Sequence, residues 1–318
     1  MAQMTEQASV NVVDPNAGLL RSTRKGRRTG ASGQHRWWPY LFALPAIVVL
    51  GLVFVYPLVD VVRDSFYSGT VSDLTFTGLS NYHLVLTNPI FIQSLLNNLR
   101  LLTTVPVMAV IALVVALVLN DVVRGWRMYR FVVFIPYILP AVAMGLCFAY
   151  LLQEDGSVNA ILNDLHLHAL ALDWLGSEQL SIYSVGGVIV WQQLGFGIVL
   201  FTAGLLGLPQ EVIEAAIMDG TNWWQRQWHV VIPQLRRVIE LFVVLEAITV
   251  LSWVFTYVYV ITHGGPGTSS SVMTYYIWQN GFEFGAVGIA ATAAVILLAM
   301  AGVLIAVYVT IRARRGEL

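Results

Sequence analysis

Residues Ala286–Ile311 read AVGIAATAAVILLAMAGVLIAVYVTI and contain no charged side chain. A helix that crosses a bilayer needs about 20 mostly apolar residues, and this stretch meets that length. The stretch Phe131–Leu152 is also free of charged residues. Both segments therefore predict helices that span a membrane.

The composition of the whole chain agrees with that prediction. Of its 318 residues, 57% are hydrophobic and 11% are charged, whereas soluble proteins have about 45–50% apolar and about 25% charged residues. These values exclude a disordered chain, a basic nucleic-acid binder and a typical water-soluble enzyme. The single cysteine, Cys147, excludes an internal disulfide framework and a cysteine-based zinc site.

Six stretches are long and apolar enough to span a bilayer. They are Trp38–Val62, Leu101–Leu119, Phe131–Leu152, Ile182–Leu208, Val238–Thr262 and Ala286–Ile311. The sequence thus predicts an all-α integral membrane protein with six transmembrane helices.

The basic residues predict how these helices are oriented. Fifteen of the 17 lie before the first span, between spans two and three, between spans four and five, or after span six. The loops on the opposite side contain only Arg63. The positive-inside rule then predicts that both termini are cytoplasmic, which requires an even number of spans.

This topology divides the chain into consecutive segments. They are a basic, disordered cytoplasmic segment (1–37), a first transmembrane helix (38–62), an extracytoplasmic loop (63–94), a core of five helices (95–312) and a cytoplasmic tail (313–318). The first apolar run has about 25 residues, too many for the apolar region of a signal peptide, so we expect an uncleaved span. The extracytoplasmic loop between spans three and four is acidic, which fits either a docking face or a solvated surface.

The cytoplasmic loop 208–235 in the core is too long for a simple helix connection. Pro209 suits a helix start and Gly220 a helix end. A second short helix containing Trp223, Trp224 and Trp228 is expected to follow, and Pro233 marks the return to the membrane. An alternative for the tryptophans is an amphipathic segment that anchors at the lipid headgroups.

Part of this loop resembles the signature of a known family. Glu214, Ala215, Ala216, Asp219, Gly220 and Pro233 match the spacing of the cytoplasmic loop in permease subunits of binding-protein-dependent ABC importers. The resemblance implies the type I permease fold of ABC importers, with a coupling helix between helices four and five that docks in a cleft of the ATPase subunit. Gln227 replaces the usual Phe, with Trp228 beside it as a possible substitute, and Arg237 replaces a second Pro.

Further motifs resemble the carbohydrate-uptake branch of that family. Among them are Leu79–Tyr82, Asn97–Asn98, Arg130–Pro136, Gly156–Asn159 and Thr262–Gly267. The last matches the first permease subunit of maltose-, glycerol-phosphate- and trehalose-type systems. The turn Gly264, Gly265, Pro266 and Gly267 is therefore a candidate docking surface for a binding protein.

The resemblance implies a set of partners in a bacterial inner membrane. They are a second, homologous permease subunit, two ATPase subunits, an extracytoplasmic solute-binding protein and a sugar. No Walker motif occurs in the sequence, so ATP and Mg are expected on the ATPase subunits, and this chain is expected to bind no cofactor and to have no enzymatic activity of its own.

Polar side chains at membrane depth are candidates for the substrate path, because they are costly there. They and the neighbouring aromatic residues are Gln192, Gln193, Phe196, Glu246, Thr249 and Trp253. Amides with aromatic faces suit a sugar, which offers hydroxyl groups and apolar ring faces. The alternative is that the polar groups only join the helices, with Glu246 paired to a partner subunit. For Glu240, the spacing predicts a local ion pair with Arg236.

The function predicted from the sequence is a permease subunit of an ATP-driven carbohydrate importer. An alternative is a secondary transporter driven by an ion gradient, with Glu246 as the proton carrier. Against it, the six spans show no inverted repeat and the cytoplasmic loop would have no role. His166 and His168 have no third ligand nearby in the sequence, so no metal site is predicted.

Overall fold

The computed structural model describes residues 38–70, 73–121 and 126–315. The chain divides into two units, Met1–Val55 and Tyr56–Leu318, which we treat separately. In the first unit the described elements are α1 (Trp38–Leu50) and the π-helical turn η1 (Gly51–Val55). The predicted basic segment 1–37 lies outside the described residues, as does the end of the tail, 316–318.

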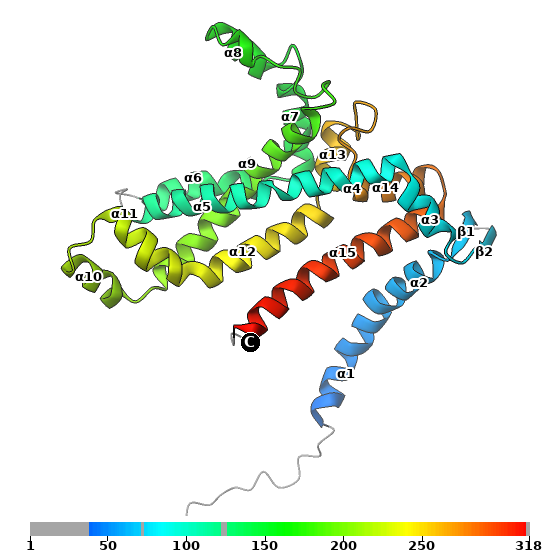
Figure 1. Ribbon diagram of the computed structural model, residues 1–318, viewed down its shortest axis with the longest axis horizontal. Helices are drawn as coiled ribbons and strands as arrows, with labels where there is room; N and C mark the ends of the chain where they lie inside the picture. The colour runs from blue at the N-terminus through cyan, green and yellow to red at the C-terminus, as the bar shows by residue number, and fades with distance from the viewer. Residues whose placement is uncertain (1–37, 71–72, 122–125, 316–318) are drawn as a thin grey trace, which may run out of the picture. The chain divides into compact units, whose positions relative to one another are not determined.

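The second unit contains nearly all the regular structure (Figure 1). Its first elements are α2 (Tyr56–Asp64), β1 (Tyr67–Thr70), β2 (Asp73–Phe76), α3 (Ser80–Thr87), α4 (Pro89–Leu102), α5 (Thr104–Asp121), α6 (Trp126–Ile138), α7 (Ala141–Leu151), α8 (Ser157–Asp164) and the 3-10 turn η2 (His168–Leu170). Then come α9 (Ser181–Leu206), α10 (Gln210–Met218), α11 (Trp223–Arg226), the π turn η3 (Gln227–Val231), α12 (Ile232–Ser252), α13 (Phe255–Ile261), α14 (Met273–Trp278), the π turn η4 (Gln279–Glu283) and α15 (Val287–Arg314).

Within the described residues, four helices are long and apolar enough to cross a membrane. They run over Phe42–Asp64, Pro89–Asn120, Ser181–Leu206 and Val287–Arg314. Two bent pairs, α6 with α7 and α12 with α13, bring the total to six if each pair counts as one span. The apolar stretches predicted from the sequence therefore all coincide with helices, but two of them are not single straight rods.

The bends have different local causes. Pro140 lies between α6 and α7, which meet at 96°. Proline has no N–H and restricts the residue before it, so a helix commonly ends there. The 48° bend between α12 and α13 follows Ser252 and has no proline within it.

Helix α9 lies at the centre of the main core, in contact with α5, α6 and α12 (Figure 1). Gly197 permits this packing: a Cβ there would lie 2.8 Å from the Ala112 Cβ and 2.9 Å from the Phe242 ring. Phe201 and Phe242 are fully buried in the same core, with their ring centroids 5.0 Å apart. Small residues at helix contacts are typical of membrane bundles, where packing drives association.

The prediction of an all-α protein is wrong in one place. The predicted loop 63–94 contains an antiparallel hairpin of β1 and β2, with Tyr67 opposite Phe76. Buried Asn81 of α3 holds it, because its Nδ2 donates to the carbonyl oxygens of Ser65 (3.0 Å) and Tyr67 (2.8 Å). The hairpin was missed because its four-residue strands are too short to give a clear alternating pattern.

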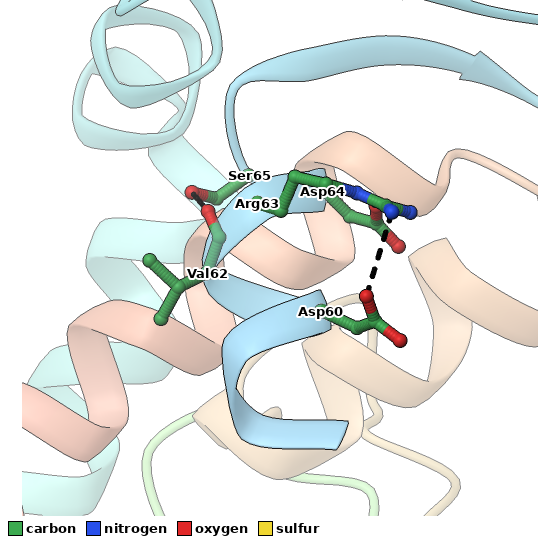
Figure 2. A network of polar contacts seen from close by, with 5 residues as sticks. All are labelled: Asp60, Val62, Arg63, Asp64 and Ser65. Atoms are coloured by element: carbon green, nitrogen blue, oxygen red, sulfur yellow. Dashed lines mark hydrogen bonds and ion pairs between the residues drawn. The ribbon is translucent and has the colours of Figure 1, made fainter. Parts of the chain in front are cut away.

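The last turn of α2 contains Arg63, the single basic residue in the loops predicted to be extracytoplasmic. Figure 2 shows Arg63 beside Asp60, at 3.5 Å, and next to Asp64, whose carboxylate lies 2.9 Å from the guanidinium. Ser65 ends the helix, and its hydroxyl donates to the Val62 carbonyl oxygen at 2.7 Å. Because two carboxylates flank Arg63, this end of the span has no net positive charge.

Candidate functional site: a loop helix, a polar interior and a glycine-rich turn

The loop 208–235, predicted to be cytoplasmic, begins with a helix that has a well-defined end. Helix α10 begins after Pro209, and Gly220 follows its C-cap with a φ of +75°. Gly220 N–H donates to the Ile217 carbonyl and Thr221 N–H to the Ala216 carbonyl, at 3.0 and 3.2 Å. This is the Schellman arrangement, which favours glycine at that position because other residues are strained at positive φ. The predicted helix end at Gly220 is confirmed.

The second predicted helix is also confirmed, although it is not separate. Asn222 and Gln225 form a capping box at the start of α11, the arrangement that satisfies free N–H groups at a helix start. The chain then continues through η3 into α12, so that one helix runs from Trp223 to Ser252. Pro233 lies in the first turn of α12, directly after η3 and within this continuous helix.

The surface of α10 combines acidic and apolar groups. Glu214, Ala215 and Asp219 are exposed, whereas Ala216 is buried. Two residues absent from the predicted site, Ile217 and Met218, expose 52% and 87% of their surface. The sequence signal for them was the presence of two large apolar residues at the end of a helix that is predicted to be cytoplasmic. Trp228 is 62% exposed, while neighbouring Gln227 is buried.

In the membrane interior, Gln192 is a structural connection. It is buried, its Nε2 donates to the Leu139 carbonyl at 2.8 Å, and its Oε1 accepts from the Tyr257 hydroxyl at 3.0 Å. Leu139 lies at the break between α6 and α7, and Tyr257 belongs to the short helix α13. Gln192 therefore joins two bent spans to the central helix.

Gln193 and Phe196 are the other two predicted path residues on α9. Gln193 is half-buried, and so is Phe196. The Phe196 ring stacks on Tyr137 of α6 with centroids 5.4 Å apart, and also lies 6.1 Å from the Phe242 centroid. Gln193 offers an amide and Phe196 an aromatic ring, so both residues remain candidates for the substrate path.

The three predicted path residues of the fifth span differ in burial and hydrogen bonding. Glu246 is buried, and its Oε2 has no hydrogen-bond partner among the described residues. Thr249 donates to its own helix, at the Leu245 carbonyl (2.9 Å). Trp253 is the C-cap of α12, its N–H donates to the Thr249 carbonyl at 2.8 Å, and 74% of its surface is exposed. A common helix face for the three groups stays a prediction.

The predicted ion pair at the inner end of α12 is confirmed. Arg236 Nε lies 2.9 Å from Glu240 Oε1. The same oxygen also lies 2.7 Å from Arg315 Nη1 at the end of α15. Glu240 therefore connects α12 to α15, an interaction between distant residues that helical spacing alone did not predict.

On the opposite side, the Gly264–Gly267 turn is held by α4. Asn97 is fully buried, and its Nδ2 donates to the carbonyl oxygens of Ser269 (2.6 Å) and Ser271 (2.8 Å). Gly264 is buried with a φ of +78°, and a Cβ there would lie 2.7 Å from the Tyr275 ring. Pro266 and Gly267 are partly and fully exposed, so the turn presents a fixed backbone at the surface.

The sequence of this region matches a known family. Residues 95–315 match the family of binding-protein-dependent transport system inner membrane components. The chain belongs to this family. The match includes α10, the interior polar groups and the outer turn.

Individual relatives cover most of the chain. A probable ABC transporter permease protein of Pyrococcus horikoshii is 31% identical over 277 residues, which are 85% of this chain and 94% of that protein. The sulfoquinovosyl glycerol transport system permease protein of Agrobacterium fabrum is 32% identical over 85% of this chain and 89% of its own length. The lactose transport system permease protein of Rhizobium radiobacter is 29% identical over 83% and 90%.

A solved structure shows the same fold. It is a chain of a bacterial ABC transporter involved in the import of the acidic polysaccharide alginate. The TM-score is 0.76 at 20% identity, over 87% of this chain and 96% of that one. This permease is thus a mostly helical membrane protein with an ABC importer permease fold.

Proposed function

We propose that this permease is one of two membrane-spanning subunits of an ATP-driven carbohydrate importer in a bacterial inner membrane. Family membership and the names of the sugar-transport relatives support the role and the substrate class. The proposed partners are a second permease, two ATPase subunits and an extracytoplasmic binding protein. The names of these relatives give no support to an ion-gradient transporter that uses Glu246.

The observation that carries the coupling role is the connection of α10 to the core. The proposed docking face, formed by Glu214, Asp219, Ile217 and Met218, is exposed on α10. Helix α10 contacts η3, and η3 continues directly into α12. Movement of an ATPase bound to α10 would therefore be transmitted to α12, which packs on α9 and carries Glu246.

The substrate would pass near the half-buried groups of the interior. Gln193 and Phe196 offer hydrogen bonds and a ring face to a sugar. Glu246 offers an unbonded carboxylate oxygen, while Gln192 holds the bent helices in place. This assignment separates the two neighbouring glutamines by role, one for the substrate path and one for the structure.

A Gly220→Pro variant tests the coupling role. Proline cannot adopt a φ of +75° and cannot donate to Ile217, so the end of α10 would be distorted. A misplaced proline costs about 3 kcal/mol in a helix, and about 1.4 kcal/mol corresponds to a tenfold change. We therefore expect sugar uptake by the reconstituted transporter to fall at least about tenfold. Membrane insertion, measured by the yield of purified complex, should be unchanged.

Gly207→Ala is the matched control. Gly207 ends α9 with a φ of −86°, and an added Cβ would meet only ordinary contacts. This variant should retain uptake. Normal uptake by Gly220→Pro, with the variant fully assembled, would refute the coupling role of α10.

A further inference from the structure

A polar cavity of about 580 Å³ lies beside the outer turn, apart from the interior groups described above. Its walls are α4, the residues at the start of α9 and the loop that follows α13. Ligand pockets commonly have volumes of about 300–1,000 Å³, so the cavity is large enough for part of an oligosaccharide.

The three walls are connected by partly buried hydrogen bonds. Asn97 of α4 donates to the Ser269 carbonyl, and it also accepts from Arg100 Nη1 at 2.9 Å. Ser181 of α9 bonds to the Ser269 hydroxyl at 3.0 Å. Asn97 and Ser181 are fully buried. The cavity is therefore preorganised, which lowers the entropic cost of binding a ligand.

The lining is polar and balanced in charge. It contains the side chains of Gln93, Arg100, Glu178, Gln179, Tyr183 and Thr268. Amides, hydroxyls and charged groups supply both donors and acceptors, and Tyr183 supplies one ring. One cation and one anion offset each other, so the lining favours a neutral polyol over a simple ion.

The position of the cavity suggests when it would be used. Pro266 belongs to the candidate docking turn and also lines the cavity. A solute released by a protein docked on that turn would therefore first meet this lining. We propose that the cavity is an entry subsite that holds the trailing sugar units of an oligosaccharide, a conclusion that rests on the proposed carbohydrate function.

A length-dependent uptake assay tests the subsite. Cells without other uptake systems for these sugars would express the whole transporter and receive labelled maltose, maltohexaose, arabinobiose or arabinohexaose. In a Cys147→Ala background, Thr268→Cys would be reacted with fluorescein maleimide to fill the cavity. Thr75→Cys, an exposed position on the hairpin and outside the cavity, is the matched control.

We expect modification at Thr268→Cys to abolish most hexasaccharide uptake and to leave disaccharide uptake unchanged. A milder variant, Gln179→Ala, should raise KM for the hexasaccharide about fivefold, as the loss of one hydrogen bond predicts. The modified Thr75→Cys control should transport both lengths normally.

Three results would overturn the subsite. Equal loss of both lengths would mean that the cavity receives the docked binding protein. Unchanged uptake of both lengths would mean that transport does not use the cavity. If the unmodified transporter imports neither hexasaccharide, the cavity has no oligosaccharide to hold. Disaccharide uptake by the unmodified transporter tests the proposed function separately.

Discussion

At the scale of single residues, two adjacent glutamines have different surroundings. Successive positions on a helix point about 100° apart, so Gln192 and Gln193 contact different neighbours. Gln192 uses both ends of its amide, donating to the Leu139 carbonyl and accepting from the Tyr257 hydroxyl. Gln193 is half-buried, and its side chain is not tied to those two groups.

Gln192→Leu should therefore destabilise the protein more than Gln193→Leu. The first change leaves the Leu139 carbonyl and the buried Tyr257 hydroxyl without their partner, at a cost of about 1–3 kcal/mol in total. Thermal unfolding in detergent should show a lower Tm for Gln192→Leu. Gln193→Leu should keep the Tm and lose uptake. If both variants show the same Tm, the structural role of Gln192 is disproved.

At the scale of elements, long-range hydrogen bonds position the outer turn. Asn97 of α4 contacts Ser269 and Ser271, which lie more than 170 positions away in the sequence. Asn98, the next residue, accepts from the Met273 N–H at 2.8 Å. The two asparagines thus attach both the turn and the start of α14 to α4.

Removing the Asn97 amide should release the turn. Asn97→Ala breaks two bonds to buried carbonyls, so we expect a loss of about 1–3 kcal/mol in stability. If the turn receives the binding protein, KM for the loaded binding protein should rise about fivefold or more, as a loss of that size predicts. ATPase assays on the reconstituted complex would measure it.

Thr103→Val is the control for that experiment. Thr103 lies at the end of the same helix and bonds only to the carbonyl of Arg100 in its own turn. It should behave like the unchanged protein. An unaltered KM in Asn97→Ala would show that the turn is not part of the docking surface.

At the scale of the whole molecule, charge predicts the orientation in the membrane. The segments assigned to the inner side carry 15 of the 17 basic residues, and Arg63 on the other side is flanked by Asp60 and Asp64. This distribution explains why a net charge of −1 conceals two opposite excesses. The positive-inside rule then assigns α10 to the cytoplasm.

Cysteine labelling would check this orientation. In the Cys147→Ala background, Met218→Cys marks α10 and Thr75→Cys marks the hairpin, and both positions are exposed. An impermeant maleimide should label Thr75→Cys in right-side-out vesicles and Met218→Cys in inverted ones. Labelling of both positions from one side would contradict the topology.

Much of this protein could be predicted from its sequence alone, because the causes are local. Apolar length predicts the spans, the distribution of arginines predicts their direction, and Gly220 predicts the end of α10 through its backbone freedom. The spacing of Glu214, Ala215, Ala216, Asp219 and Gly220, taken together with the other motifs, predicted the family to which the chain belongs.

Only the tertiary structure decided which polar groups are satisfied and where the fifth span breaks. The hydrogen bonds of Gln192, Asn97 and Glu240 join residues that are distant in sequence, and the helix break at Trp253 has no proline to predict it. The physical reason is that a polar group in a membrane must find a partner, and its partner is set by how the helices pack.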